Sequence, residues 1–185
     1  MIKDAIRETE TKMKNSIQSL EDDFTRIRTG RATPALIEKL AVEYYGVPTP
    51  LQQLASISVP EARQLMIKPF DASSVKDIEK AFLTSDLGLT PNNDGKVIRL
   101  NLPPLTEDRR KDLVKLVNTR LEEGRISVRN FRRDTIKDIR EFEQEKMISE
   151  DDLERGEKEI QDLTNSFIEQ MENIATEKEK DIMEV

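Results

Sequence analysis

The sequence predicts a two-domain α+β protein, in which a small β/α/β sandwich domain is inserted into a long antiparallel three-helix bundle. One long stretch before residue 30 and two after residue 104 carry apolar side chains at helical spacing. All eight prolines lie between residues 34 and 104, where short runs of β-forming residues replace the helical pattern. Charged residues make up 36% of the chain. An average globular protein has about 25%, so the composition favours elongated helices over one compact globule.

The first helix is expected to extend over about 28 residues and to end at Thr29-Gly30, because glycine commonly terminates helices. Its apolar residues follow steps of three and four, as on one face of a helix. They are Ile2, Ile6, Met13, Leu20, Phe24 and Ile27, with Thr9 and Ile17 in the gaps. We expect a positive φ at Gly30, since glycine adopts this conformation without steric cost.

The inserted segment is expected to fold as a small α+β module. Its predicted strands are residues 40–45, 54–59, 65–68 and 97–102. A short helix follows Ser73 or Ser74 as its cap and carries Val75, Ile78 and Phe82 before it ends at 86–88. Residues 46–50 cannot be helical, because Pro48 and Pro50 fix φ and restrict the residues before them. Residues 93–95 (Asn-Asp-Gly) predict a turn.

Two further long helices are expected after residue 104. Thr106 is a suitable cap for the first, and acidic residues follow it where the helix dipole favours them. Its apolar face consists of Leu113, Val117, Leu121, Val128, Phe131, Thr135, Ile139 and Phe142, with Gly124 on the same side. Ser149 and Asp152 predict the start of the last helix, as a capping box with Asp in place of Glu. The stripe of that helix is Leu153, Ile160, Leu163, Phe167, Met171, Ile174 and Ile182.

The domain boundaries follow from the need of each amphipathic helix to bury its apolar stripe. We assign residues 1–30 and 105–185 to one bundle and residues 31–104 to the inserted domain. The chain crosses between them twice, near 30–32 and 103–105, so a hinge is geometrically feasible and an L-shaped molecule is expected. The predicted hinge residues are Gly30, Arg31, Pro103, Pro104 and Leu105.

Composition excludes several classes of catalytic and metal site. The chain has no cysteine, histidine or tryptophan, which excludes disulfides, cysteine nucleophiles, imidazole-based triads and zinc sites built on thiolates or imidazoles. Its six glycines are isolated, so no phosphate-cradling loop is expected. No stretch approaches the roughly 18 apolar residues of a membrane span, and the N-terminus lacks the apolar core of a signal peptide. We expect a cytoplasmic protein without catalytic residues or a metal site.

Charge is distributed unevenly along the chain, whose formal net charge is −7. Residues 109–140 contain 11 basic and 5 acidic residues, whereas residues 141–185 contain 5 and 16. The basic segment places four arginines at i, i+4, i+7 and i+8 on one helix face: Arg125, Arg129, Arg132 and Arg133. Two interpretations remain open, a polyanion site or a solvated face neutralised by ion pairs. The partners in the second case are Glu122, Asp134 and Asp138.

A second basic element, Arg26, Arg28 and Arg31, lies at the end of the first helix. These cations complement the helix dipole, or they extend a phosphate site if the bundle places them beside the four arginines. Tyr44 and Tyr45 are the only tyrosines, and strand alternation predicts that one points into the small domain and the other outward.

Several short segments, taken together and in order, resemble the bacterial ribosome recycling factor family over the whole chain. They are RTGRA (28–32), VEYYG (42–46) with Pro48 and Pro50, QLAS (53–56), SDLGL (85–89), LPPLTE (102–107), VRN (128–130), RRD (132–134) and ISEDD (148–152). The resemblance implies a three-helix bundle with an inserted β/α/β module, roughly the shape of a tRNA.

The resemblance also implies a function. It is that of a monomeric, non-enzymatic translation factor, which acts after termination with elongation factor G and GTP to split the ribosome into subunits. It implies that the bundle lies against large-subunit rRNA and that the partner, rather than this chain, uses GTP, so no cofactor is expected. The RNA-contacting arginines of the family correspond to Arg28, Arg31, Arg129, Arg132 and Arg133, and the basic face adds Arg125. The alternatives are a coiled-coil adaptor and a general RNA-binding protein.

Overall fold

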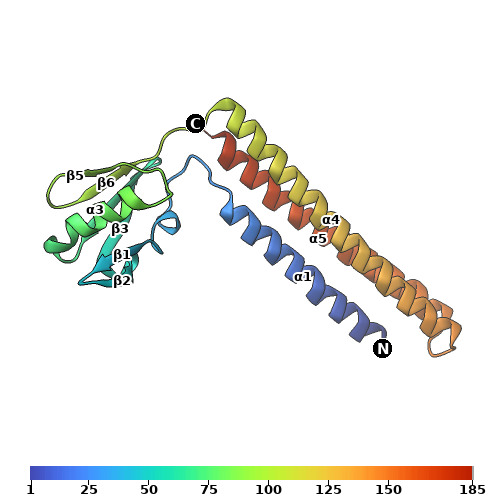
Figure 1. Cartoon of the computed structure of the whole chain (residues 1–185). Coiled ribbons are helices and arrows are strands. Elements are labelled where there is room, and N and C mark those ends of the chain that lie inside the picture. The colour runs from blue at the N-terminus through green and yellow to red at the C-terminus, as the bar shows by residue number, and fades with distance from the viewer. Residues whose placement is uncertain (185) are drawn as a thin grey trace. The chain divides into compact units, whose positions relative to one another are not determined.

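The computed structural model describes residues 1–184, which form two compact units (Figure 1). The helical unit comprises residues 1–27 and 107–183, and the β-containing unit comprises residues 28–106 together with Glu184. The two units thus meet a few residues outside the boundaries expected at 30/31 and 104/105. The three long helices form one unit and the strands lie in the other, so the predicted α+β fold class is confirmed.

The helical unit consists of α1 (Ile2–Arg26), α4 (Glu107–Gln144) and α5 (Glu150–Met183). Figure 1 shows α4 and α5 side by side along their length. Gly124 of α4 faces Met171 of α5, and Gly156 of α5 faces Ile139 of α4, so these two helices are antiparallel. A hydrogen bond joins Thr9 of α1 to Thr135, which places α1 against α4 as well.

The bundle core follows most of the predicted stripes. Along α1 and α4, the predicted positions are buried except Ile2, Ile17, Gly124, Phe131 and Phe142, which are half-buried. The prediction is partly wrong for α5, where Leu153, Leu163 and Ile174 are half-buried and the smaller Gly156, Thr164 and Ala175 are buried instead. Small residues occupy this line because the helices approach closely: a Cβ at Gly156 would lie 3.3 Å from Cγ2 of Ile2.

Two helix ends test the predicted caps. The N-terminus of α5 is confirmed: the backbone N–H of Asp152 donates to Ser149 Oγ at 3.1 Å, and Ser149 Oγ donates to the Asp152 carboxylate at 2.8 Å. The predicted end of the first helix is wrong, since α1 ends at Arg26 and the N–H of Ile27 donates to the carbonyl of Phe24. Gly30 lies beyond this cap and does not have a positive φ, so no left-handed residue terminates α1.

The β-containing unit holds a four-stranded antiparallel sheet in the order β3-β4-β6-β5. Its strands are β3 (Ala55–Glu61), β4 (Gln64–Pro69), β6 (Ile98–Asn101) and β5 (Pro91–Asn93). A separate hairpin pairs β1 (Ala41–Tyr44) with β2 (Val47–Pro50), followed by the single helical turn α2 (Leu51–Leu54). The helix α3 (Val75–Thr84) shares one core with both sheets, and that core includes Val42, Leu51, Leu65, Ile67, Ile78, Phe82, Ile98 and Leu100.

The hairpin contains the main difference from the expected strands. Residues 47–50 were expected only to be non-helical, yet they form β2 with prolines at two of four positions. Proline is tolerated there because β2 is an edge strand with one hydrogen-bonded neighbour. The turn at Tyr45 and Gly46 has φ values of 51° and 78°. As expected, Tyr44 points inward, where its hydroxyl donates to Asp71, while Tyr45 is 80% exposed.

Candidate nucleic-acid interface

The four arginines of the basic segment lie on an unbroken part of α4, so their helical spacing is preserved. Arg125 and Arg132 contact residues of α5, which shows that this face of α4 borders the α4–α5 seam. The side of α4 that packs on α1 is a different one, marked by Thr135. The structure therefore brings the four arginines together on one side of the helical unit, but it gives them different partners.

Arg125 is held by two carboxylates. Its Nη1 lies 3.0 Å from Glu172 of α5, and its Nε lies 3.2 Å from Glu122. The Nε atom is buried and does not have hydrogen-bond geometry to Glu122, so Glu172 is the better-directed partner. With its side chain 27% exposed, Arg125 fits the ion-pair interpretation of the basic face.

Arg129 is more weakly compensated. Its Nη1 lies 3.6 Å from Glu122, the carboxylate that also contacts Arg125, and its side chain is 46% exposed. One carboxylate is thus shared between two guanidinium groups. Coulomb attraction between exposed groups at this distance is weak in water, so Arg129 remains available to an anionic ligand.

Arg132 and Arg133 have neutral partners. Arg132 Nη1 donates to Gln161 Oε1 of α5 at 2.9 Å, and Arg133 donates to Asn130. Within residues 1–184 no carboxylate lies within ion-pair distance of either guanidinium. These two arginines are therefore oriented by hydrogen bonds while their positive charges stay uncompensated.

The predicted acidic partners Asp134 and Asp138 do not pair with these arginines. Both lie near Lys12 of α1, whose pKa is raised mainly by the hydrogen bond and charge of Glu8 and to a smaller degree by these two aspartates. The ion-pair interpretation is thus correct at Glu122 and wrong at Asp134 and Asp138.

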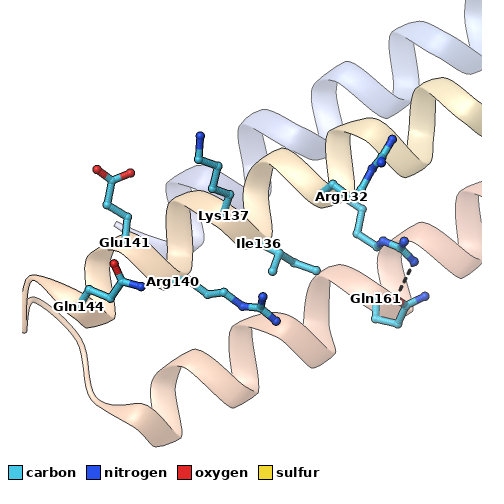
Figure 2. A pocket seen from close by; sticks show the side chains of 8 residues that line it. Arg132, Ile136, Lys137, Arg140, Glu141, Gln144 and Gln161 are labelled. Carbon is cyan, nitrogen blue, oxygen red and sulfur yellow. Dashed lines mark hydrogen bonds between the residues drawn. The ribbon is translucent and has the colours of Figure 1, made fainter.

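A groove of about 800 Å³ continues the basic face toward the end of α4 (Figure 2). Its basic lining residues are Arg132, Arg133, Lys137 and Arg140, and Ile136, Glu141, Gln144 and Gln161 complete it. Arg140 Nε lies 2.6 Å from Glu157 of α5. Sequence reasoning missed Lys137 and Arg140 as site residues, although both continue the i+4 spacing from Arg133 and Ile136.

Arg26 is the member of the second basic element that lies in the helical unit. It lies in the last turn of α1. Leu20 of α1 and Gly124 of α4 line the same pocket, so Arg26 lies level with the part of α4 before Gly124. Arg28 is exposed and Arg31 pairs with Glu184; both belong to the β-containing unit.

The predicted hinge residues also fall in the β-containing unit. A Cβ added at Gly30 would lie 3.9 Å from Cγ of Leu105, an ordinary contact, so the two chain crossings run close together. Their role as a hinge remains a prediction. Within the described residues, none of the helices is long and apolar enough to span a membrane.

Comparison with known proteins identifies the family. The model of the family described as "Ribosome recycling factor" matches residues 20–183. This chain belongs to the ribosome recycling factor family. Proteins called ribosome-recycling factor from a Roseiflexus species, Heliobacterium modesticaldum and Chloroflexus aurantiacus are 51%, 52% and 53% identical over 185 residues, covering all of this chain and all of each relative.

Solved structures of ribosome recycling factors are similar as well. A solution structure is 42% identical and has a TM-score of 0.76, covering 100% of this chain and 98% of the other. A model of the T. thermophilus factor, described with the E. coli elongation factor G as bound to the E. coli post-termination complex, is 43% identical with a TM-score of 0.64. That comparison covers both chains completely. The whole-chain resemblance inferred from the sequence is therefore confirmed.

Proposed function

We propose that this protein binds the post-termination ribosome and, together with elongation factor G and GTP, splits it into subunits. The mRNA and tRNA are released, and translation can restart. The observation that carries the proposal, beyond family membership, is the pair Arg132 and Arg133, whose charges are oriented by neutral partners and left uncompensated. Such guanidinium groups suit the phosphate oxygens of large-subunit rRNA.

The proposed RNA-binding residues differ in their roles. Arg132 and Arg133 contact phosphates directly, and Arg129 does so after loosening its 3.6 Å contact with Glu122. Arg125 does not contact phosphate in this proposal; its ion pair with Glu172 holds α4 and α5 together beside the other arginines. Arg28 and Arg31 are proposed to contact rRNA from the β-containing unit.

The protein is proposed to act as a monomer in the cytoplasm, without enzymatic activity or a cofactor of its own. In this proposal the GTP is hydrolysed by elongation factor G. The chemistry of the described site supports this division, because the groove on α4 offers hydrogen-bond donors and charge but no nucleophile paired with a base.

We also propose that the links at residues 30–32 and 103–105 act as a hinge during splitting. Pro103 and Pro104 fix φ and stiffen one link, whereas Gly30 leaves the other freer. Spin labels on the two units would measure this. A single narrow distance distribution that does not change on the ribosome would exclude a hinge.

The central test is subunit splitting followed by light scattering, with post-termination ribosomes, elongation factor G and GTP. We expect splitting with the unaltered protein and a strong loss with the double variant Arg132→Ala/Arg133→Ala at an unchanged melting temperature. Co-sedimentation with ribosomes in rising salt separates the alternatives. A coiled-coil adaptor would show little salt dependence, and a general RNA-binding protein would bind but would not split ribosomes.

A further inference from the structure

The groove at the end of α4 is lined mainly by two rows of α4 side chains, and within each row the residues are spaced four apart. One row is Arg132, Ile136, Arg140 and Gln144, and the other is Arg133, Lys137 and Glu141. Figure 2 shows Ile136 between Arg132 and Arg140, directed toward α5, whereas Lys137 and Glu141 point away from α5. Arg132 and Arg140 are eight residues apart, which corresponds to about 12 Å along the helix axis.

The two ends of the groove differ in charge. At the first end, Arg132, Arg133 and Lys137 have no carboxylate within ion-pair distance among residues 1–184. At the second end, Glu157 compensates Arg140 at 2.6 Å, and Glu141 adds a negative charge to the lining. A phosphate is therefore favoured at the first end and disfavoured at the second.

The middle and the second end are suited to a nucleobase. Ile136 is half-buried and offers an aliphatic surface in a lining that is otherwise polar. The guanidinium of Arg140 is fixed by Glu157 and presents a planar face, on which bases stack well. Gln144 is exposed, and its amide, which has no hydrogen-bond partner within the described part of the chain, offers both a donor and an acceptor.

We propose that this groove binds one unstacked RNA nucleotide. Its base lies on Ile136 and Arg140 with its edge toward Gln144, and its flanking phosphates lie on Arg132, Arg133 and Lys137. The inference rests on the proposed function, because it names the RNA element that the basic face receives. An unpaired nucleotide is required since a base inside an A-form helix presents no face for stacking.

Salt dependence distinguishes a base contact from a phosphate contact. Loss of a phosphate contact lowers the slope of log K against log salt by about one unit or less, whereas loss of a base contact lowers affinity and leaves the slope unchanged. We therefore choose Ile136→Ala, with ribosomes as the probe. We expect a roughly threefold to tenfold loss of affinity, at or below the scale of a lost base–aromatic stack, with an unchanged slope. Ile136→Met keeps an apolar surface and is expected to retain affinity.

Leu116→Ala provides the matched control. Leu116 is a 40% exposed aliphatic residue of the same helix, and it is not part of the groove lining. Melting temperatures of all variants are compared, so that a loss of folding is recognised. If Ile136→Ala binds as the unaltered protein does, or if it lowers the slope, the base contact is excluded, while a loss caused by Arg132→Ala would still support the proposed function.

A photo-cross-link identifies the occupant. A benzophenone amino acid in place of Gln144, in the full-length protein bound to ribosomes, is expected to form an adduct with an rRNA nucleotide. An adduct with a ribosomal protein, or no adduct while the variant still binds, would overturn the inference. The inference stands only if both the affinity result and the RNA adduct are obtained.

Discussion

Arg132, like Arg133, is expected to contribute more to ribosome binding than Arg125 or Arg129 of the α4 face. Each neutralised phosphate changes the slope of log K against log salt by about 0.7 for single strands to 0.9 for a duplex. Since 0.1 M salt is tenfold below the 1 M reference, one lost contact lowers affinity at 0.1 M by roughly fivefold to eightfold. Arg132→Ala should show this full effect, because its partner Gln161 is neutral and no compensating charge is set free.

Arg129 and Arg125 should rank below Arg132. Arg129→Ala should lose less affinity, since Glu122 at 3.6 Å already offsets part of its charge. Arg125→Ala should change affinity by less than about twofold, because two carboxylates hold its guanidinium. It should instead lower the free energy of unfolding by about 1 kcal/mol or less, as expected for a partly exposed ion-pair network.

The assay is equilibrium binding to ribosomes at several salt concentrations from 0.05 to 0.2 M, a range suited to counterion analysis at about one slope unit per contact. Circular dichroism melting of each variant checks the fold. An equal loss of affinity for Arg125→Ala and Arg132→Ala would refute the reasoning, because it would show that local ion pairs do not decide which arginines are available.

Further predictions concern the stability of the bundle and are measured by thermal or denaturant unfolding. Gly124→Ala should stabilise by less than about 1 kcal/mol, because its Cβ meets only the flexible thioether of Met171 at 3.2 Å, whereas Gly156→Ala should destabilise by about 1 kcal/mol since its Cβ meets the stiffer Ile2 and Ile139. Thr135→Val should lower the free energy of unfolding by less than about 1 kcal/mol. The hydroxyls of Thr9 and Thr135 make three contacts but carry only two hydrogens, so one contact is already without a proton, and Thr9 keeps its 2.9 Å hydrogen bond to the carbonyl of Ala5. Ser149→Ala should cost about 1 kcal/mol as a lost cap. Hydrogen bonds from Ser149 lower the pKa of Asp152 below its ordinary 3.8, so the contribution of Asp152 is present above pH 3.8 and is lost as the pH falls through the lowered pKa; the melting curves of the unaltered protein and of Asp152→Asn should converge there.

Local signals in the sequence were sufficient for most elements of the fold. The capping pair Ser149 and Asp152 and the turn at residues 93–95 are determined by side chains within three residues of each other, so a sequence carries them completely. Strand β2 was not predicted, because its two prolines have low β-propensity. The strand forms through its register with β1, which propensity does not reveal. The end of α1 was predicted too late in the sequence, because Gly30 is a common helix terminator whereas Ile27, the actual cap, carries no recognisable stop signal.

The candidate site shows where sequence reasoning reaches its limit. Spacing on α4 correctly gave one face for the four arginines, since the period of a helix is fixed. It could not give their partners on α5, because these depend on how two helices are aligned. Glu172 was therefore not foreseen for Arg125, nor Gln161 for Arg132. The two aspartates proposed as partners from sequence instead interact with Lys12 of α1, whose pKa they raise.

The alignment of α4 and α5 places Gln161 against Arg132. Although the segment 141–185 carries 16 acidic residues, α5 presents a neutral amide to Arg132 and carboxylates to Arg125 and Arg140 on either side. The residue at position 161 should therefore decide how strongly this face attracts RNA. Gln161→Glu would place a carboxylate where Oε1 now lies, 2.9 Å from Nη1 of Arg132. We expect ribosome affinity to fall roughly as in Arg132→Ala, with the melting temperature unchanged or slightly raised by the new ion pair. Gln170→Glu, the same change at an exposed residue of α5 that does not line the groove, is the matched control and should not weaken binding. Unchanged affinity of Gln161→Glu across the salt series would show that Arg132 does not contact phosphate.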